Sequence, residues 1–320
     1  MRHASSRFAV GGLLALAALV MAPGFASAQG SRPVDLVGQW ASRNGEDAPY
    51  RGPGGFLGDY TGLPINAASR QMASSWDAGS HSQPERSTQA HPVQYAMRGE
   101  GPNMRISEVR DAATDALIAL KLVGVYGRSD RTIWMDGRPH PNNYAEHTWD
   151  GFSTGTFHDG VLTVVTTHMK MGVIQKVGVY TSPNSVMTEH FWRHGQFLTS
   201  VSIIEDPVYL EEPFVRSSTW QVEPAQVVVP IQPWDAVVEL VDKPAGWVPH
   251  SPPGTEHREP SKLYDIPYEA TLGGAATMYP EYQVTIAKLR EQEKARVAEA
   301  AAAKTPAAKA PAKAGKAGKK

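Results

Sequence analysis

Histidine is concentrated in the middle of the chain, and it is the side chain best suited to proton transfer or metal binding near neutral pH. Five of the eleven histidines lie between residues 140 and 190: His140, His147, His158, His168 and His190. No His-Glu-x-x-His motif occurs, so the spacing by itself predicts no metal site. A metal-assisted site would require the fold to assemble distant ligands, namely His140, His147, His168 and Glu189.

Residues 136–141, with the sequence Asp-Gly-Arg-Pro-His-Pro, form the most distinctive polar stretch. Two prolines stiffen it. In a functional interpretation, Arg138 clamps an anionic group and His140 moves a proton. In a structural interpretation, Asp136 caps backbone N–H groups in a turn and Arg138 pairs with a distant carboxylate, Asp206 or Glu189.

Two further residues, His168 and Glu189, complete the candidate catalytic set, and Asp206 is an alternative to Glu189. His168 alternates in phase with an apolar strand face and is a second candidate base. Glu189 stands four residues from Arg193, about 13 Å along a strand, so it needs another partner. Asp206 precedes a proline that ends a strand, and it is the alternative orienting carboxylate. The candidate ligand-binding residues are Asp136, His147, Trp149, Asp206 and Tyr209.

Several reaction classes are excluded by what the sequence lacks. The chain has no cysteine, which excludes disulfides, thiol catalysis and cysteine-based zinc sites. It also has no P-loop and no dinucleotide-binding fingerprint, and its Gly-x-Ser-x-Gly at residues 151–155 lies along an expected strand, so it is not the strand-to-helix turn of a nucleophile elbow. The sequence therefore names no cofactor.

Short β-type runs separated by turn signals extend from residue 103 to residue 241. We expect strands over residues 106–109, 116–126, 131–135, 152–157, 161–169, 186–193, 197–204, 215–229 and 236–241. Asp159-Gly160 predicts a type I′ hairpin that pairs Phe157 with Leu162. A second hairpin should turn at His194-Gly195 or at Gly195-Gln196.

The two faces of this second hairpin differ in composition. One resembles a core and is formed by Thr188, His190, Trp192, Phe197, Thr199, Val201 and Ile203. The other is mixed and is formed by Glu189, Phe191, Arg193, Leu198, Ser200 and Ser202. We interpret the mixed face as lining a ligand cavity or as partly solvated.

These elements predict an all-β fold, an antiparallel β-barrel or sandwich, with long N-terminal loops, one short helix and a C-terminal helix. We divide the chain into a signal peptide (1–28), a loop-rich region with a first strand (29–102), the β core (103–241), a proline-rich extended segment (242–280), a helix (281–303) and a disordered tail (304–320). The short helix is expected within residues 66–76. An outer-membrane barrel is the structural alternative.

The two ends of the chain give information about where the protein is located and not about its fold. A basic start, the apolar run of residues 8–20 and Ala26-Ser27-Ala28 predict a cleaved signal peptide, with a retained anchor as the alternative. We therefore expect a periplasmic or secreted protein without a transmembrane segment. The tail carries six lysines and the leader carries two arginines. Subtracting these eight positive charges from the net charge of −1 leaves the rest of the chain with a net charge of −9. An acidic body argues against nucleic-acid binding, while the tail allows weak contact with anionic envelope polymers or lipid head groups.

Two resemblances support these expectations. Gly38-Gln39-Trp40 resembles the Gly-x-Trp that opens lipocalin chains, which implies a calycin-like barrel. The chain also resembles a family of secreted bacterial proteins over residues 35–290. The matching motifs are Met-Asp-Gly-Arg-Pro-His-Pro at 135–141, Trp-x-Gly-Phe-Ser-x-Gly at 149–155, Leu-Thr-Val-Val-x-Thr at 162–167, Thr188-Glu189, and Asp-Pro-x-Tyr at 206–209. His190 and Phe157 depart from that pattern. The resemblance implies export and a β-rich fold, and it implies no particular reaction.

Three functions remain open at this stage. The first is a binding protein that holds a small apolar or amphipathic ligand in the barrel, with Arg138 or a histidine fixing its polar end. The second is a hydrolase, lyase or isomerase, cofactor-free or metal-assisted, in which Arg138, His140, His168 and Glu189 converge on one pocket. The third is a structural envelope protein without a pocket.

Overall fold

The computed structural model describes residues 35–43, 55–77, 92–97, 103–124, 130–175, 177–223, 225, 242–244 and 247–304. The chain divides into a unit of Met1–Arg32 and a unit of Pro33–Lys320. All the structure below belongs to the second unit. The predicted signal peptide, the strand at 236–241 and the tail beyond residue 304 lie outside the described residues.

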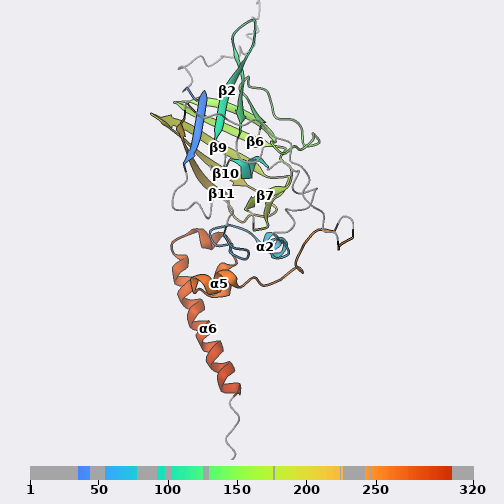
Figure 1. Ribbon diagram of the computed structural model, residues 1–320, viewed down its shortest axis with the longest axis vertical. Helices are drawn as coiled ribbons and strands as arrows, with labels where there is room; N and C mark the ends of the chain where they lie inside the picture. Colours follow the sequence, from blue (N-terminus) through green and yellow to red (C-terminus); the bar gives the residue numbers. More distant parts are fainter. Residues whose placement is uncertain are drawn as a thin grey trace, which may run out of the picture. The chain divides into compact units, whose positions relative to one another are not determined.

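A closed β-barrel of nine strands forms the centre of this unit (Figure 1). Its strands follow one another around the wall in the order β1-β11-β10-β9-β6-β5-β4-β3-β2. Their bounds are β1 Gly38–Arg43, β2 Met104–Arg110, β3 Leu117–Val123, β4 Asp130–Trp134, β5 Phe152–His158, β6 Val161–Thr167, β9 Val186–His194, β10 Phe197–Glu205 and β11 Phe214–Val222. The predicted β-barrel is confirmed.

One pair of strands departs from the antiparallel pattern. β4 and β5 run parallel, with Ile133 beside Ser153 and Trp134 beside Thr154. Parallel neighbours cannot be joined by a tight turn. The chain therefore returns through residues 135–151, the segment that contains the Asp-Gly-Arg-Pro-His-Pro stretch. The other neighbouring strands of the barrel are antiparallel.

Both predicted hairpins are confirmed. In the first, Phe157 pairs with Leu162 and the turn residues Asp159 and Gly160 have φ values of 48° and 80°. Positive φ at both positions is the signature of a type I′ turn. In the second, Phe197 pairs with His194, so Gly195-Gln196 is the two-residue loop.

The assignment of the two faces of the second hairpin requires a correction. The face expected to be core, with Thr188, His190 and Trp192, points out of the barrel and is half-buried. The mixed face, with Glu189, Phe191 and Ser200, points inward and is buried. Composition misled the assignment because the inward Glu189 is neutralised by Arg131 of another strand, while the outward histidine, tryptophan and threonine side chains tolerate partial exposure.

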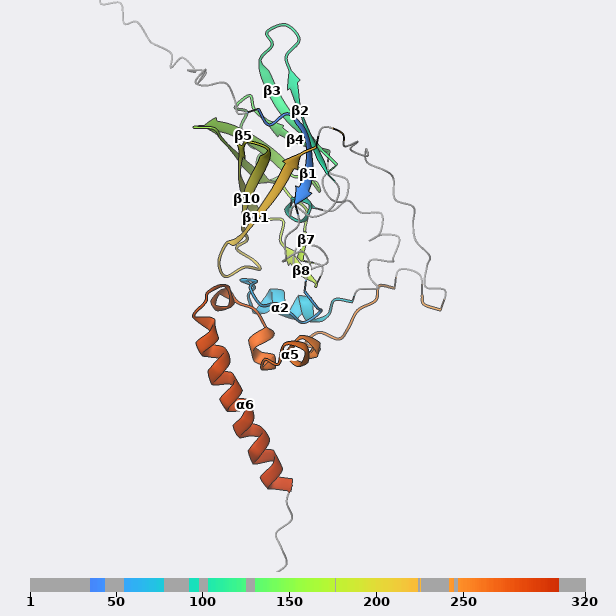
Figure 2. The ribbon, with the colours of Figure 1, turned by 60° about the vertical axis from the view of Figure 1, so that its left-hand side comes forward.

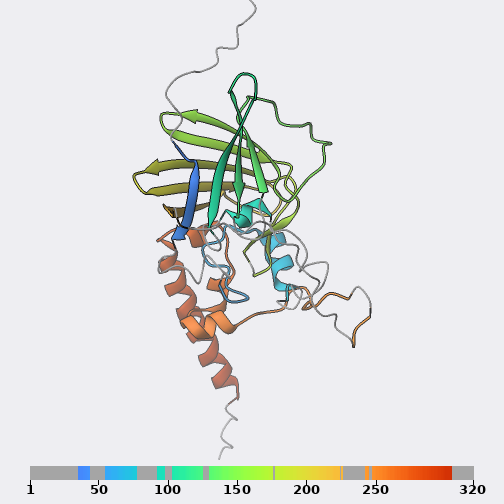
Figure 3. The same ribbon diagram turned by 45° about the horizontal axis from the view of Figure 1, so that its top comes forward.

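Smaller elements complete this unit outside the nine strands of the wall (Figures 1, 2 and 3). α2, Ala67–Ser74, is the predicted short helix, and the side chain of Asn66 caps it by accepting from Ser69 N at 3.0 Å. β7 (Gly172–Gln175), β8 (Val179–Thr181) and α4 (Val93–Ala96) were not predicted. The predicted extended segment contains α5 (Glu259–Tyr264), η2 (Tyr268–Thr271) and η3 (Ala275–Met278). α6, Tyr282–Lys304, is the expected C-terminal helix.

Residues 55–77 and 247–286 are joined to each other, and we call them the accessory lobe. Backbone bonds connect Tyr60 N to Thr271 O at 2.9 Å and Gly274 N to Leu63 O at 2.9 Å. An isolated bridge between Ile65 and Leu210 attaches the lobe to the loop before β11. Among the described residues no helix is both long and apolar enough to cross a membrane.

The β5–β6 turn gives a direct test of the hairpin. Gly160→Ala is expected to lower the unfolding free energy by roughly 1–2 kcal/mol, because an alanine at positive φ is strained. Gly160→Asn is the matched control, since asparagine tolerates this conformation, and its loss should be smaller. Chemical denaturation of both variants measures the difference. Equal losses would contradict the turn assignment.

Candidate functional site

The inside of the barrel carries a buried ion pair. The side chains of Arg131 on β4 and Glu189 on β9 are both fully buried, and Nη2 lies 2.5 Å from Oε2. Arg131 also donates from Nε to Ser153 Oγ at 3.1 Å and from Nη2 to Thr166 Oγ1 at 2.8 Å. Because these residues belong to four consecutive strands of the wall, the arginine crosses its inner surface. We call this set the interior polar network (Arg131, Ser153, Thr166 and Glu189).

Three polar atoms on the inner face of the strands around this network have no hydrogen-bond partner among the described residues. They are Arg131 Nη1, Glu189 Oε1 and the hydroxyl of Ser200. Ser200 lies on β10 beside β9, directly opposite Phe191. A buried polar atom without a partner is costly, and such atoms are normally satisfied by ordered water or a ligand. The network therefore has one donor, one acceptor and one hydroxyl to offer inside the barrel.

The helix α4 closes the barrel beside this network. All four of its residues are fully buried. Arg216 and Ser218, on the inward face of β11, donate to the carbonyl oxygens of Gln94 (2.6 Å) and Met97 (3.3 Å). The side chain of Gln94 donates from Nε2 to Thr181 Oγ1 at 2.7 Å. A one-turn helix thus covers the interior and is bonded to β11 through backbone carbonyl oxygens.

Two predicted catalytic histidines form a hydrogen-bonded chain outside the barrel. His140 approaches Thr167 Oγ1 with Nδ1 (2.7 Å) and Thr154 Oγ1 with Nε2 (2.8 Å). His168 approaches the same Thr167 oxygen with Nδ1 (2.8 Å) and Asn142 O with Nε2 (2.9 Å). We call His140, Thr167 and His168 the histidine relay.

The direction of the bonds in the relay follows from its one fixed acceptor. A carbonyl oxygen only accepts, so His168 Nε2 carries a proton and its Nδ1, in the neutral ring, accepts from the Thr167 hydroxyl. The Thr167 oxygen then accepts from His140 Nδ1–H, and His140 Nε2 accepts from Thr154. Burial, and then the positive charge that His168 can carry, lower the pKa of His140. Both effects favour the neutral form of His140.

The remaining residues of the 135–151 connection make local contacts. His147 Nδ1 lies 3.0 Å from Met169 O, and its ring centroid is 5.2 Å from that of His168. The backbone oxygen of Trp149 accepts from Val93 N at 2.9 Å. No group of three His, Cys, Asp or Glu residues suited to a metal ion occurs within the described parts of the chain.

Arg138 pairs with a neighbour instead of a distant carboxylate. Its Nε lies 2.9 Å from Asp136 Oδ1, and its guanidinium carbon stands 3.5 Å above the Trp134 ring. This ion pair with Arg138 lowers the pKa of Asp136. The structural interpretation correctly predicted that Arg138 pairs with a carboxylate. The carboxylate is Asp136, and neither Asp206 nor Glu189 is the partner.

Asp206 and Tyr209 belong to the loop between β10 and β11. The buried Asp206 carboxylate accepts from Ser182 N (2.5 Å), Ser182 Oγ (2.7 Å) and Val208 N (2.9 Å). The backbone oxygen of Tyr209 accepts from Asn66 N at 3.0 Å. In this structure Asp206 anchors a turn, and the Tyr209 backbone connects that turn to α2.

The four expected catalytic residues do not converge on one cavity. Glu189 lies inside the barrel, His140 and His168 lie outside it, and Arg138 is bound to Asp136. The structure does bring together His140, His147 and His168. It also supplies the partner that Glu189 required, Arg131, which the sequence analysis missed. The available signal was the alternation of Arg131 with Ile133 and Met135, because an arginine in phase with apolar residues faces the core.

Comparison with protein-family models, curated proteins and solved structures finds no match to the chain.

The buried ion pair predicts a non-additive effect of mutation. Arg131→Met or Glu189→Leu alone should destabilise the protein by about 3–5 kcal/mol, since each leaves an unpaired charge inside the barrel. The double variant should recover most of that loss, because it removes both charges. Chemical denaturation of the three variants completes a double-mutant cycle. Additive losses would show that the two side chains do not depend on each other.

The relay predicts a pH effect on stability. Because the pKa of His140 is lowered in the folded state, the unfolded chain binds the proton more readily. Stability should therefore fall as pH drops below about 6.5, the ordinary histidine pKa. His140→Gln should reduce this dependence in thermal unfolding between pH 7.5 and 5. His158→Gln is the control, since His158 is exposed, and an equal effect in both variants would contradict the assignment.

Proposed function

We propose that this protein is an exported binding protein that holds a small amphipathic ligand inside its β-barrel. Export rests on the leader sequence, and ligand binding rests on the interior of the barrel. The observation that carries the proposal is the set of buried polar atoms without partners: Arg131 Nη1, Glu189 Oε1 and Ser200 Oγ. A ligand group that both accepts and donates hydrogen bonds would satisfy them.

The surroundings of these atoms define the rest of the ligand. Buried apolar side chains stand next to the network on the same inner surface: Ile133, Val164, Met187 and Phe191. Methionine adapts its shape to a bound molecule more readily than branched residues do. The ligand therefore carries a polar end at the network and an apolar body against these side chains.

Access to the interior requires α4 to move. Arg216 and Ser218 of the barrel wall donate hydrogen bonds to the backbone of this segment. Local opening of such a short element costs less than global unfolding. We infer that α4 is displaced when the ligand enters and that the polar contacts it leaves are replaced by the ligand or by water.

The calycin-like resemblance agrees with this proposal. Trp40, the tryptophan of the Gly-x-Trp match, lies fully buried in the first barrel strand. Its indole nitrogen donates to Leu36 O at 3.0 Å, and Arg193 stands 5.3 Å from its ring centroid. The enzyme hypothesis has less support, because its acid–base and carboxylate residues lie on opposite sides of the barrel wall.

The test is native mass spectrometry of the full-length protein purified from the periplasm of its own host. The wild type should carry an additional mass that dissociates on denaturation. Glu189→Gln keeps the side-chain size but removes the acceptor charge, so the additional mass should be lost or strongly reduced. Ser200→Ala should reduce it without lowering stability, because it removes a hydroxyl that has no partner.

Glu205→Gln is the matched control, since Glu205 is exposed at the end of β10. It should retain the additional mass at the wild-type level. A wild type with no bound molecule, or a bound mass unchanged in both interior variants, overturns the proposal.

A further inference from the structure

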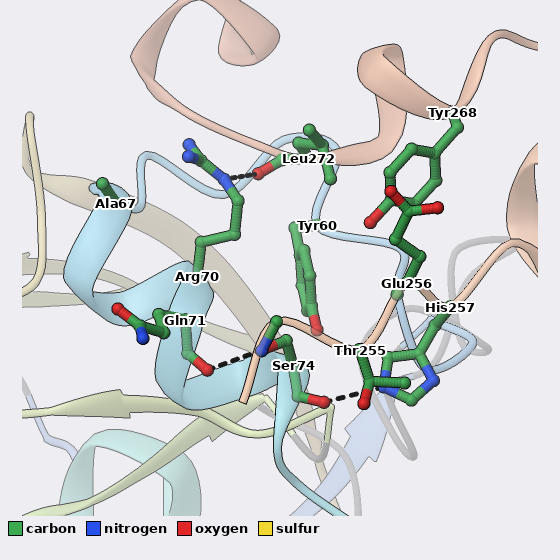
Figure 4. A pocket seen from close by; sticks show the side chains of 12 residues that line it. Tyr60, Ala67, Arg70, Gln71, Ser74, Thr255, Glu256, His257, Tyr268 and Leu272 are labelled. Atoms are coloured by element: carbon green, nitrogen blue, oxygen red, sulfur yellow. Dashed lines mark hydrogen bonds between the residues drawn. The ribbon is translucent and has the colours of Figure 1, made fainter. Parts of the chain in front are cut away.

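The accessory lobe contains a cleft of about 330 Å³, which is separate from the interior of the barrel (Figure 4). Its walls come from two distant parts of the sequence, residues 58–74 and 254–272. Apolar atoms form most of the wall. The size and the mostly apolar lining with a few polar groups are those of a small-molecule site.

Ser74, at the end of α2, holds the two parts together. Its hydroxyl accepts from Gly254 N at 2.8 Å, and its carbonyl oxygen accepts from His257 Nε2 at 2.9 Å. Gly58 allows this close approach: it has a φ of 91°, and a Cβ there would lie 2.5 Å from both Cβ and the carbonyl oxygen of His257. The cleft is therefore a built part of the fold.

The wall formed by α2 carries Arg70, whose guanidinium is not paired with a carboxylate among the described residues. Arg70 on α2 donates from Nε to Leu272 O at 2.7 Å. No acidic oxygen within the described ranges lies within 4.0 Å of its guanidinium nitrogens. The terminal nitrogens are thus available for a bidentate contact, the geometry in which arginine binds a carboxylate most strongly.

The floor presents a buried hydroxyl without a partner. Tyr60 is 2% exposed, and its phenol oxygen has no hydrogen-bond partner among the described residues. In Figure 4 this oxygen points toward Thr255. Burial raises the pKa of Tyr60, so the hydroxyl keeps its proton in alkaline solution. An orphan donor of this kind is the second observation that points to a bound acceptor.

We propose that this cleft binds a small organic carboxylate, with Arg70 pairing with the anionic group and the Tyr60 hydroxyl donating to an acceptor on the ligand. The body of the ligand lies against Ala67, Leu272 and the ring of Tyr268. The one acid that lines the cleft does not repel it, because Glu256 is paired with Arg258 at 2.7 Å. This proposal does not depend on a ligand inside the barrel.

The first experiment is calorimetric titration of the full-length protein with acetate, benzoate and 3-phenylpropionate, each compared with its neutral amide. At least one of the larger carboxylates should bind about tenfold more tightly than its amide, since the amide cannot form the charge-assisted pair. If no carboxylate binds more tightly than its amide, the proposal fails.

Variants then locate the site. Arg70→Met should weaken binding of the preferred carboxylate at least tenfold, and Tyr60→Phe about three- to tenfold. Tyr60→Phe should leave the thermal midpoint unchanged or raised, because the hydroxyl that it removes has no partner in the free protein. A purely structural tyrosine would instead lower it.

Arg290→Met is the matched control, because Arg290 lies on α6 and bonds to Asp265 O outside the cleft. It should bind the carboxylate like the wild type. If Arg290→Met and Arg70→Met have the same effect, the binding is nonspecific electrostatics and the cleft is not the site.

Discussion

The ion pair of Arg131 and Glu189 is the constraint on which the barrel interior depends. Two charges without access to water are tolerated only when each has close polar partners. Here the partners come from neighbouring strands, so β4, β5, β6 and β9 must keep one register for Ser153 and Thr166 to reach the guanidinium. A slip of one residue would turn every one of these side chains outward. The pair therefore specifies the arrangement of this part of the wall as well as its chemistry.

Much of the fold follows from local sequence signals, while the site depends on register. Turn chemistry at Asp159-Gly160 predicts both the hairpin and its pairing, and the capped pattern after Asn66 predicts α2. The interior polar network was not predictable in the same way. Glu189 and Arg131 are 58 positions apart, and only the order of strands around the barrel brings them together. The parallel contact between β4 and β5 is equally non-local, because it depends on how the chain returns between them.

The connection between β4 and β5 explains why the histidines cluster outside the barrel. A parallel neighbour requires the chain to travel back along the wall, and residues 135–151 do so. His140 and His147 are placed by this return path near His168, which follows β6 and has a φ of 55°. The high density of histidine in this part of the sequence therefore corresponds to a real cluster in space. It did not report a shared site with Glu189, because alternate residues of a strand face opposite sides of the wall.

Closure of the barrel joins strands from the two ends of the described β region. β1 pairs with β11, so Trp40 lies opposite Val222. This contact spans about 180 residues, and a contact of such high sequence separation carries a large loop-closure entropy during folding. During synthesis, the barrel cannot close until β11 has emerged. Until then β1 and β10 each keep an open hydrogen-bonding edge, and such edges favour edge-to-edge association of incompletely synthesised chains.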